Sequence, residues 1–369
     1  MRVGTDTSKL PGSQANGAIW TLEHIAQLGL DGAFFRSPFE LSATLDPAEL
    51  ADVAAAAQSL GLYLEVGVAK VNPFATPETP AVRALGDGDF MLGLERMIRA
   101  VTAIGITELW TATASYQFHL QGLRACDRFR TDVDWPAQLR ATTKVLRRIA
   151  PVLRDTGAHL NVETHEEITS FEAVRLVEDA GGTDCFGITF DIANVVVRGE
   201  DPVAAARRVA PYTRMTHLRD VALATTEEGI GRFIVPVGRG VVDWQPVIRE
   251  LLTHAPQANL SVEGVVEDAA EMPLYVDNPE WRASHTDLTD AELDEVRRLT
   301  RAYEERAEAP GPAALRAPVD EEGGLAFIVE SAAALRAHLA EARTALAAEL
   351  LTRSRTPEYA HAHTFGGTR

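Results

Sequence analysis

Short apolar runs alternate with longer amphipathic stretches from residue 2 to about residue 265. The short runs are rich in β-branched residues, which is typical of strands, whereas the longer stretches repeat apolar residues at helical spacing. The pattern predicts strands near 2–5, 32–36, 62–68, 106–113, 159–163, 186–191, 213–218 and 259–264. Helices are predicted between them, near 18–29, 46–60, 89–104, 135–156, 170–180, 201–209 and 243–254.

Several of these helices carry start and stop signals. Asp46 offers an N-cap oxygen directly before Pro47, a residue that suits the first helical position. Thr169 followed by Glu172 fits a capping box, and Gly157 lies where a helix should stop. The signals support the predicted boundaries.

Strands that alternate with helices predict a parallel sheet with helical crossovers. A dinucleotide-binding sheet would carry Gly-x-Gly-x-x-Gly after its first strand, but the first turn here reads Thr5-Asp6-Thr7-Ser8-Lys9. The eight repeats therefore favour a closed barrel. We predict an α/β protein, a (β/α)₈ TIM barrel with an extended helical C-terminal region.

Two segments depart from the repeat. Residues 114–134 form a long connection after the fourth strand, and such loops are often functional. Beyond the barrel, predicted to span 1–265, an extension over 266–369 contains a helix near 290–306 and another near 328–353. The last helix has an apolar stripe that must be buried. It could cover the barrel wall, form a dimer or hold a different subunit.

The chain is acidic, with 35 Lys and Arg against 53 Asp and Glu and a formal net charge of −18. This excess argues against nucleic acid or an anionic membrane as a partner. It does not exclude a sugar phosphate or other anionic substrate, because the local field of a cleft can oppose the net charge. Two distant cysteines, the lack of a secretory signal and the lack of a membrane-length apolar run predict a cytoplasmic protein with reduced thiols.

Each of the last four predicted strands ends at a potential metal ligand: Glu163, Asp191, His217 and Glu263. A barrel brings neighbouring strand ends together at one face, where active sites lie. Any one of these residues alone is more simply read as a helix cap or a satisfied rim residue. Three converging carboxylates repel one another unless a cation compensates them, and the set suits Mn²⁺, Mg²⁺, Co²⁺ or Zn²⁺. The sequence predicts one divalent metal site.

Residues 1–265 resemble the xylose-isomerase-like superfamily of sugar and sugar-phosphate isomerases and epimerases. The resemblance lies in Glu163-x-His165, Phe190-Asp191, the run from His217 to Asp220 and the segment Gly238-Arg239-Gly240-Val241-Val242-Asp243-Trp244. This chain departs from the family pattern at two positions: it has Arg219 where the family often has Lys, and Asn194 where the family often has His. The role that the family's histidine has in binding metal or substrate is therefore in doubt at Asn194.

The resemblance implies proton abstraction beside a carbonyl, with one divalent ion, Mn²⁺ first among the candidates, as Lewis acid for an enediolate. Glu163 and Glu263 would exchange the proton on opposite faces of the substrate. His165 could act as acid or base, or could hydrogen-bond a ligand carboxylate. The expected substrate-binding residues are Arg219, Asn194, Glu65 and Lys70. Arg219 could instead pair with Asp220, and Glu65 and Lys70 could be rim residues.

Isomerisation or epimerisation is the default outcome of this chemistry, but elimination of a β-substituent would make the protein a lyase. The run from Asp277 to Trp281, with His285 to Thr289 after it, resembles the branch that contains catalytic subunits of C-glycoside deglycosidases. Those enzymes cleave 3-oxo-C-glycosides and work with a small second subunit. We therefore expect a sugar or glycoside substrate and a homo-oligomer or a hetero-oligomer with such a subunit.

Two other classes remain as alternatives. A metal-free barrel could serve as a non-catalytic binding module, although intact ligands at four strand ends count against it. A metal endonuclease of the same fold would need a basic surface and more histidines, so the acidic chain fits that class poorly.

Overall fold

The computed structural model describes residues 1–74, 80–114, 116–117, 119–265 and 271–355. Its central sheet has eight parallel strands in the order β10-β1-β2-β3-β4-β5-β6-β7. Leu218, directly after β7, bridges Val262 of β10, and this bridge closes the ring. The strands are β1 Val3–Asp6, β2 Gly32–Phe35, β3 Tyr63–Gly67, β4 Glu108–Thr111, β5 His159–Glu163, β6 Phe186–Asp191, β7 Thr213–His217 and β10 Leu260–Val262.

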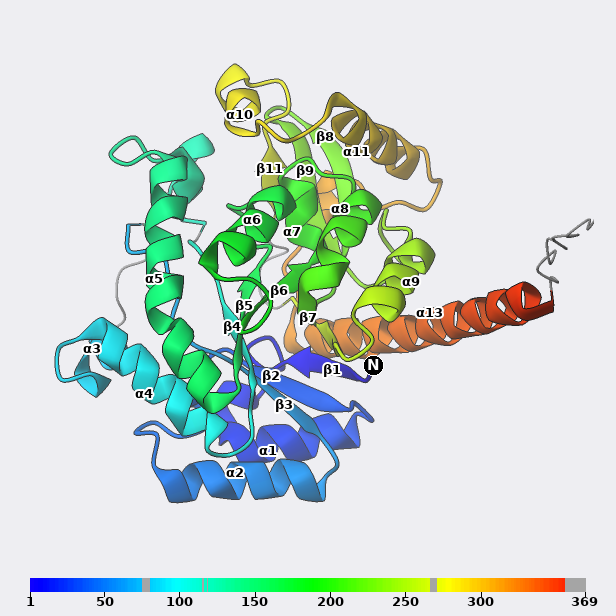
Figure 1. The fold of residues 1–369 in the computed structure, drawn as a ribbon. Helices are drawn as coiled ribbons and strands as arrows, with labels where there is room; N and C mark the ends of the chain where they lie inside the picture. Colours follow the sequence, from blue (N-terminus) through cyan, green and yellow to red (C-terminus); the bar gives the residue numbers. More distant parts are fainter. Residues whose placement is uncertain (75–79, 115, 118, 266–270, 356–369) are drawn as a thin grey trace, which may run out of the picture.

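Helices surround this barrel (Figure 1). They are α1 Ser13–Gln27, α2 Pro47–Ser59, α3 Pro80–Leu85, α4 Phe90–Thr102, α5 Trp135–Thr156, α6 Ser170–Ala180, α7 Ile192–Val197, α8 Pro202–Val209 and α9 Trp244–His254. Every predicted strand and helix of the repeat is present, so the TIM-barrel prediction is confirmed. The short helices α3 and α7 were not predicted, because six residues hold too few turns to show a period.

The predicted helix signals form real caps. Asp46 accepts hydrogen bonds from the backbone of Ala48 and Glu49 at the start of α2. Thr169 and Glu172 form both halves of a capping box on α6. Gly157 ends α5 in the left-handed region with φ 69°, where a side chain would be strained.

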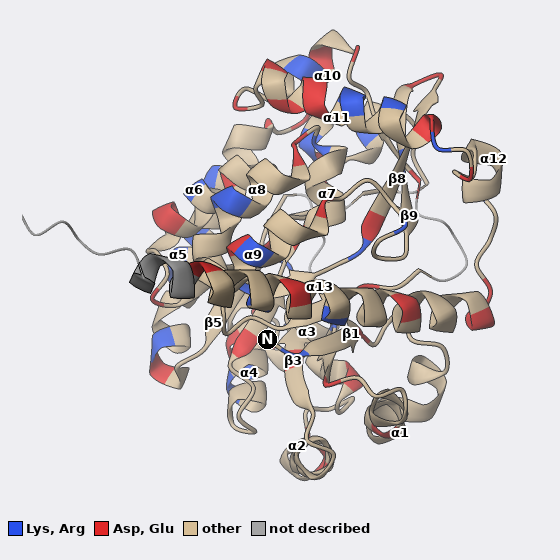
Figure 2. Cartoon of the chain, turned by 90° about the vertical axis from the view of Figure 1, so that its right-hand side faces the viewer, with Lys and Arg blue, Asp and Glu red and all other residues tan. Residues whose placement is uncertain are grey.

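The long helix α13 (Glu321–Arg355) occupies the eighth helical position of the barrel. It packs against β1, β10 and α9, across the side of the barrel that Figure 2 faces. Ile328, Ala332, Leu335 and Leu339 are buried at helical spacing along its inner face. Of the alternatives for the C-terminal helix, the structure shows packing on the barrel wall, and the helix begins before the predicted residue 328.

A small antiparallel sheet lies over the barrel and was not predicted. It contains β8 (Asp220–Thr226), β9 (Gly229–Val235) and β11 (Met272–Leu274), in the order β11-β9-β8. Figure 1 shows it beside α10 (Pro279–Ser284) and α11 (Asp290–Glu304). The sequence did hold a hairpin signal, because two apolar runs flank the polar turn at residues 227–229.

The long connection after β4 holds the extension against the barrel. It contains the short 3₁₀ helices η2 (Leu123–Ala125) and η3 (Asp127–Phe129). Arg128 is buried and forms an ion pair with Glu172 at 2.7 Å, while its guanidinium also contacts Ser284 of α10. Arg124 pairs with Glu280 of the same helix at 2.6 Å. These contacts give the arginines of this loop a structural role.

The remaining elements are brief: η1 Pro38–Glu40, η4 Ala210–Tyr212 and α12 Pro312–Leu315. Within the described ranges, no helix combines the length and the apolar character needed to cross a membrane. Cys126 and Cys185 are both buried and free, as expected of reduced thiols.

Candidate metal centre

The four predicted ligands converge at the C-terminal end of the barrel. One donor atom from each of Glu163, Asp191, His217 and Glu263 lies within 4.8 Å of the others, and all four residues are buried. Strand register explains the convergence, since Asp191 pairs directly with His217 and Glu163 pairs with Thr189 on the next strand. Glu263 follows β10, which the bridge at Leu218 ties to β7.

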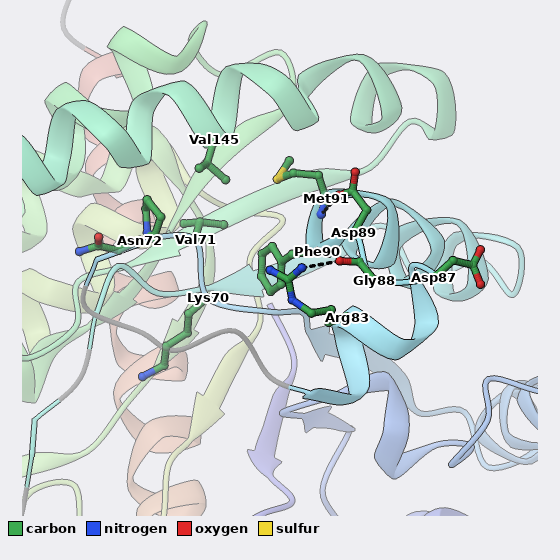
Figure 3. A pocket seen from close by; sticks show the side chains of 11 residues that line it. Lys70, Val71, Asn72, Arg83, Asp87, Gly88, Asp89, Phe90, Met91 and Val145 are labelled. Carbon is green, nitrogen blue, oxygen red and sulfur yellow. Dashed lines mark hydrogen bonds between the residues drawn. The ribbon is translucent and has the colours of Figure 1, made fainter.

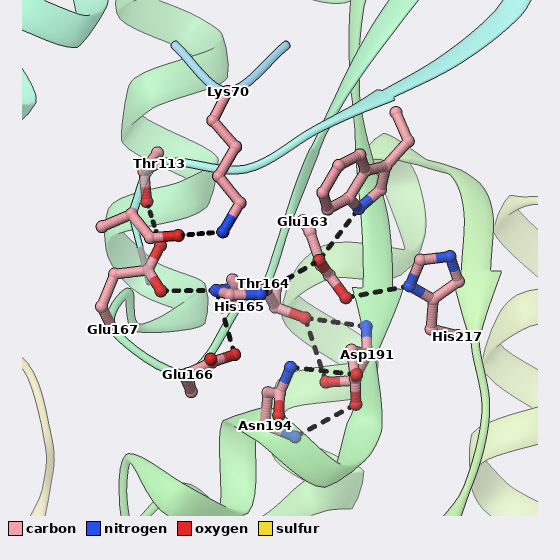
Figure 4. Close-up of polar contacts among 12 residues, drawn as sticks. Lys70, Thr113, Glu163, Thr164, His165, Glu166, Glu167, Asp191, Asn194 and His217 are labelled. Atoms are coloured by element: carbon pink, nitrogen blue, oxygen red, sulfur yellow. Dashed lines mark hydrogen bonds and ion pairs between the residues drawn. The ribbon is translucent and has the colours of Figure 1, made fainter. Parts of the chain in front are cut away.

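Glu163 and His217 face each other across this end of the barrel. The Nδ1 atom of His217 lies 2.9 Å from Oε1 of Glu163, and the indole of Trp110 donates to Oε2 at 2.9 Å (Figure 4). Phe34 packs beneath the imidazole, with ring centroids 4.7 Å apart. Phe34, Trp110 and Met215 belong to a buried apolar cluster that supports the two ligands from below.

Asp191 serves as a helix cap and as a member of the site. Its Oδ1 atom accepts from the backbone nitrogens of Ala193 and Asn194 at the start of α7. Its Oδ2 atom accepts from the side-chain amide of Asn194 at 2.9 Å and from Arg219 at 2.6 Å. Asn194 therefore orients the carboxylate of Asp191, a predicted ligand, directly.

Two arginines compensate the carboxylate of Glu263. Arg219 forms ion pairs with Asp191 at 2.6 Å and with Glu263 at 3.0 Å. Arg36, which follows β2, donates to Glu263 and also pairs with Asp6 at the end of β1 at 2.7 Å. Arg219 thus pairs with the predicted ligands and not with Asp220.

Burial and these charges set the protonation of the site. Burial raises the pKa of Asp191 to about 6, and the nearby carboxylates of Glu263 and Glu163 add to this. Burial alone would also raise the pKa of Glu263, but Arg219 and Arg36 outweigh it and hold the pKa well below its usual range. Burial opposes the charged form of His217, yet the carboxylate of Glu163 raises its pKa.

The residues fit a divalent ion. Mn²⁺, Mg²⁺ and Zn²⁺ bind oxygen and nitrogen donors at roughly 2.0–2.2 Å, so donors on opposite sides of an ion lie about 4 Å apart. The 4.8 Å limit on the donor atoms here is close to that separation. Among the described atoms, the buried Oε2 of Glu263 has no hydrogen bond beyond its ion pair with Arg219 at 3.0 Å. The cluster is therefore consistent with a divalent metal site.

His165 lies beside the ligands. Its Nδ1 atom contacts Glu167 at 2.6 Å and Glu166 at 3.0 Å, and its Nε2 atom lies 3.8 Å from Glu163. Thr113 donates to the other oxygen of Glu167 at 2.6 Å, which fixes that carboxylate (Figure 4). Burial opposes a charged imidazole, but Glu166 and Glu167 raise the pKa of His165 well above its ordinary value.

The ligands open onto a cavity of about 170 Å³. His165, Asn194 and Arg219 line it, together with Arg36 and Lys9. The lining also includes residues from the small sheet: Arg232 of β9 and Met272 of β11. The sheet therefore forms part of the wall of this cavity.

Glu65 and Lys70 do not line this cavity. Glu65 is buried inside the barrel and accepts from Asn259, which precedes β10, at 2.9 Å. Lys70 donates to the carbonyl oxygen of Ala114 at 2.7 Å. It borders a separate hollow of about 590 Å³ that is also lined by Arg83 and Phe90 (Figure 3).

Asp220, the last residue of the predicted run, organises the loop before α9. Its carboxylate accepts from the backbone nitrogens of Gly238 and Val242 and from the indole of Trp244. A Cβ atom on Gly240 would lie 2.2 Å from this carboxylate, so only glycine fits there. The contacts with Asp220 give the Gly238–Trp244 segment a structural role, which accounts for its resemblance to the family motif without a catalytic role.

Sequence reasoning missed Arg36, Trp110 and Arg232. Arg36 stands at the end of the second strand, so the argument used for the last four strands could have found it. Trp110 lies within an apolar strand and gives no sign that its indole would reach a ligand. Arg232 is a single charge inside the apolar run of β9, and that position was a usable signal.

Fold and site together define a (β/α)₈-barrel protein in which the buried cluster of Glu163, Asp191, His217 and Glu263 suits a divalent ion. Comparison with known families gives the class its name, since the model of the xylose isomerase-like TIM barrel family matches residues 22–285. The chain belongs to this family. The expected superfamily is thereby confirmed, whereas the deglycosidase branch is not shown.

Individual relatives are distant. The uncharacterized protein YihM of Escherichia coli (strain K12) is 29% identical over 101 residues, which cover 27% of this chain and 29% of YihM. A solved L-ribulose 3-epimerase is 17% identical with a TM-score of 0.59, covering 96% of this chain and 99% of that one. A D-psicose 3-epimerase solved with D-fructose is 20% identical with a TM-score of 0.55, covering 82% and 98%. Identities this low establish the shared fold alone.

Proposed function

We propose that this protein is a metal-dependent enzyme that removes and returns a proton beside the carbonyl of a keto-sugar. The observation that carries the proposal is the placement of Glu163 and Glu263. They are the outer members of the arc formed by β5, β6, β7 and β10, with Asp191 and His217 between them. Two carboxylates on either side of a small cavity suit proton transfer at two faces of one carbon.

The chain's own residues would hold and prepare the site. Glu163, Asp191, His217 and Glu263 would bind one divalent ion, Mn²⁺ first among Mg²⁺, Co²⁺ and Zn²⁺, which would supply a Lewis acid for the carbonyl oxygen. Trp110 fixes one oxygen of Glu163, and Arg36 fixes one of Glu263. These hydrogen bonds restrict the side chain of each glutamate to the orientation that faces the cavity.

His165 and Arg219 would contact the substrate. His165 is held through Nδ1 by Glu167, which leaves Nε2 on the side of Glu163, where it could donate to or accept from a sugar hydroxyl. Arg219 lines the cavity, and its buried Nε has no hydrogen-bond partner within the described part of the chain. Asn194 would act through Asp191, which it orients.

The keto-sugar class is supported by the two epimerases named above, whose shared fold matches nearly the whole of their length. The competing reaction is elimination from a 3-oxo-C-glycoside, which begins with the same proton removal. The run from Asp277 to Thr289 suggested it, but in the structure Trp281 is buried against Gly199, and the rings of His285 and Trp281 are in contact with centroids 4.0 Å apart. This packing gives the run a structural role, so we favour epimerisation or isomerisation.

The test measures deuterium incorporation and metal content in the wild-type protein and in the same set of variants. Metal-loaded enzyme would be incubated in D₂O with D-fructose, D-ribulose and a 3-oxo-C-glycoside. We expect deuterium at the carbon beside the carbonyl of a free ketose, and about one divalent ion per chain. Glu163→Gln and Glu263→Gln should lower exchange by roughly 10²–10⁴, the usual worth of a general acid or base. His217→Ala should lose the metal.

Glu108→Gln is the control. Glu108 is the first residue of β4, at the end of the barrel opposite the metal cluster, where it pairs with Arg214 of β7. This variant should keep both the metal and the exchange. Aglycone release would favour the lyase. If a fully metal-loaded protein catalysed no deuterium exchange into any of the substrates, a binding module would be favoured. Unchanged metal content in Glu163→Gln and His217→Ala would contradict the site itself. A hetero-oligomer with a small subunit stays a prediction, testable by light scattering of the purified protein and its co-purifying chains.

A further inference from the structure

Arg232 is a buried cation in the middle of the small sheet. It lies on the central strand β9, where it pairs with Leu223 of β8 and Met272 of β11. Its residue surface is only 1% exposed. Directly paired residues of an antiparallel sheet point to the same face, and both Arg232 and Met272 line the cavity above the metal cluster. The guanidinium therefore belongs to the wall of the candidate active site.

Among the described residues, this guanidinium lacks the partners that a buried charge requires. Its Nε and Nη1 atoms have no hydrogen bond, and no carboxylate of the described chain forms an ion pair with it. Burial, with the nearby Arg219 adding to it, lowers the pKa of Arg232 to about 10, which leaves the guanidinium charged at neutral pH. An uncompensated buried charge is costly, so such a group is expected to have a binding role.

The carboxylates around the cavity are already paired. Arg219 pairs with Asp191 and Glu263, and Arg36 pairs with Asp6 and Glu263. The carboxylates next to His165 pair with its imidazole. A divalent ion in the cluster would add further positive charge. Arg232 and the half-buried Lys9 are thus cations of the cavity lining for which the described residues show no ion pair.

We propose that the cavity takes a keto-sugar of monosaccharide size that carries a compact anionic group, and that Arg232, with Lys9, binds this group. The proposal rests on the proposed function and names its substrate class. A guanidinium binds carboxylates and phosphates through charge-assisted hydrogen bonds, which are stronger than those to neutral hydroxyls. The cavity of about 170 Å³ has room for a small ligand and not for a long one. The acidic net charge of the chain does not oppose this, because the charge that acts is local.

A matched series of ligands tests the proposal by binding alone. D-Fructose, D-fructuronate and D-fructose 6-phosphate share one carbon skeleton and differ in the group at C6. Calorimetric titration of the Mg²⁺-loaded wild-type protein should show at least one anion binding about tenfold or more tightly than D-fructose. A preference for D-fructuronate identifies a carboxylate, and a preference for D-fructose 6-phosphate identifies a phosphate ester. Equal affinity for all three, or binding of neither anion, would overturn the proposal.

Variants assign the effect to the residue. Arg232→Gln should reduce the preference for the anion to about twofold or less, and Arg232→Lys should retain part of it because the charge remains. The control Arg207→Gln removes an arginine whose side chain is 62% exposed on α8, and it should leave the preference unchanged. An anion preference that survives in folded Arg232→Gln would overturn the role of Arg232. Should that variant fail to fold, the wild-type series and Arg232→Lys still decide the question.

The two proposals fail separately. Deuterium exchange into D-fructose without any anion preference would retain the proton-transfer function and reject the anionic substrate class. A tenfold anion preference that depends on Arg232, without exchange in any ligand, would retain the anion-binding site and reject the proposed chemistry.

Discussion

Asp191 shows that a residue at a strand end can be a helix cap and a candidate metal ligand at the same time. One oxygen caps α7, as an isolated aspartate at that position is expected to do, while the other faces Arg219 and the candidate metal cluster. The convergence of the four predicted ligands could be predicted because each stands at a strand end, a place defined by chain order alone. The sequence could not show that Trp110 reaches Glu163 from within a strand, because that contact depends on the tilt of neighbouring strands.

Glu65 is the residue for which side-chain direction mattered most. Its place in the third strand made it a candidate for the cup, yet it accepts from Asn259 inside the barrel, away from the cavity. Period-two alternation indicates which residues face the interior of a barrel, but not at which level of the interior they lie. The predicted substrate role of Glu65 therefore has no support from its position.

Glu65 should make the protein less stable as pH rises. Burial, with Glu108 adding to it, raises the pKa of Glu65 from 4.5 to about 7. Between those values the folded protein binds more protons than the unfolded chain, so the free energy of unfolding falls as pH increases. At 1.36 kcal/mol per pKa unit the loss approaches about 3 kcal/mol above pH 7. Glu65→Gln should recover up to about 3 kcal/mol at pH 8 and little at pH 4, measured by urea unfolding.

Exposed Glu305 at the end of α11 is the matched control, and Glu305→Gln should change stability by less than about 0.5 kcal/mol at both pH values. An equal gain for Glu65→Gln at pH 4 and pH 8 would show that the effect does not come from ionisation.

At the scale of elements, length and capping decided what could be predicted. The helices α2 and α6 were located nearly to the residue, because capping signals at Asp46 and Thr169 coincide with their apolar periods. The helices α1 and α13 begin several residues before the predicted positions. The β8–β9 hairpin was missed because it interrupts the alternation of strand and helix that otherwise explained the chain. It is also the element that brings Arg232 to the cavity, so an unpredicted element carries the residue on which the proposed substrate class depends.

Asp220 joins this hairpin to the barrel, and its removal should be costly. Asp220→Ala leaves the buried donors of Val221, Val242 and Trp244 without their acceptor. At about 1–3 kcal/mol for each unsatisfied buried group, we expect a loss of at least about 3 kcal/mol in chemical unfolding. Asp243→Ala is the control in the same loop, because Asp243 is exposed and its side chain forms no cap hydrogen bond. Equal stabilities of the two variants would contradict the role of Asp220.

At the scale of the whole molecule, the barrel could be predicted from repetition, but the position of its eighth helix could not. An insertion separates β10 from α13, so the chain order alone did not reveal that the C-terminal helix belongs to the ring. Its apolar stripe showed only that it must be buried against something. The contacts with β1, β10 and α9 depend on long-range geometry that local patterns do not contain.

The packing of α13 should contribute strongly to stability. Leu335 is fully buried, and Leu335→Ala should cost about 2–5 kcal/mol in urea unfolding monitored by circular dichroism. Val329 lies on the outer face of the same helix with 44% of its surface exposed, and Val329→Ala should cost about 0.5 kcal/mol or less. Similar losses in both variants would indicate that α13 does not seal the barrel as described.

The late position of α13 also determines the order in which the ring can be completed during synthesis. β1 pairs with β10 through Val3 and Leu260, so the first strand of the barrel to leave the ribosome cannot complete its pairing until the last strand has been made. The helix that covers this seam follows only after residues 263–320 have been made. Until β10 has been made, the edge of β1 offers unpaired backbone groups to other chains, and until α13 has been made the pair lacks its covering helix. The nascent protein is therefore most exposed to misassembly at the seam between its first and last barrel strands.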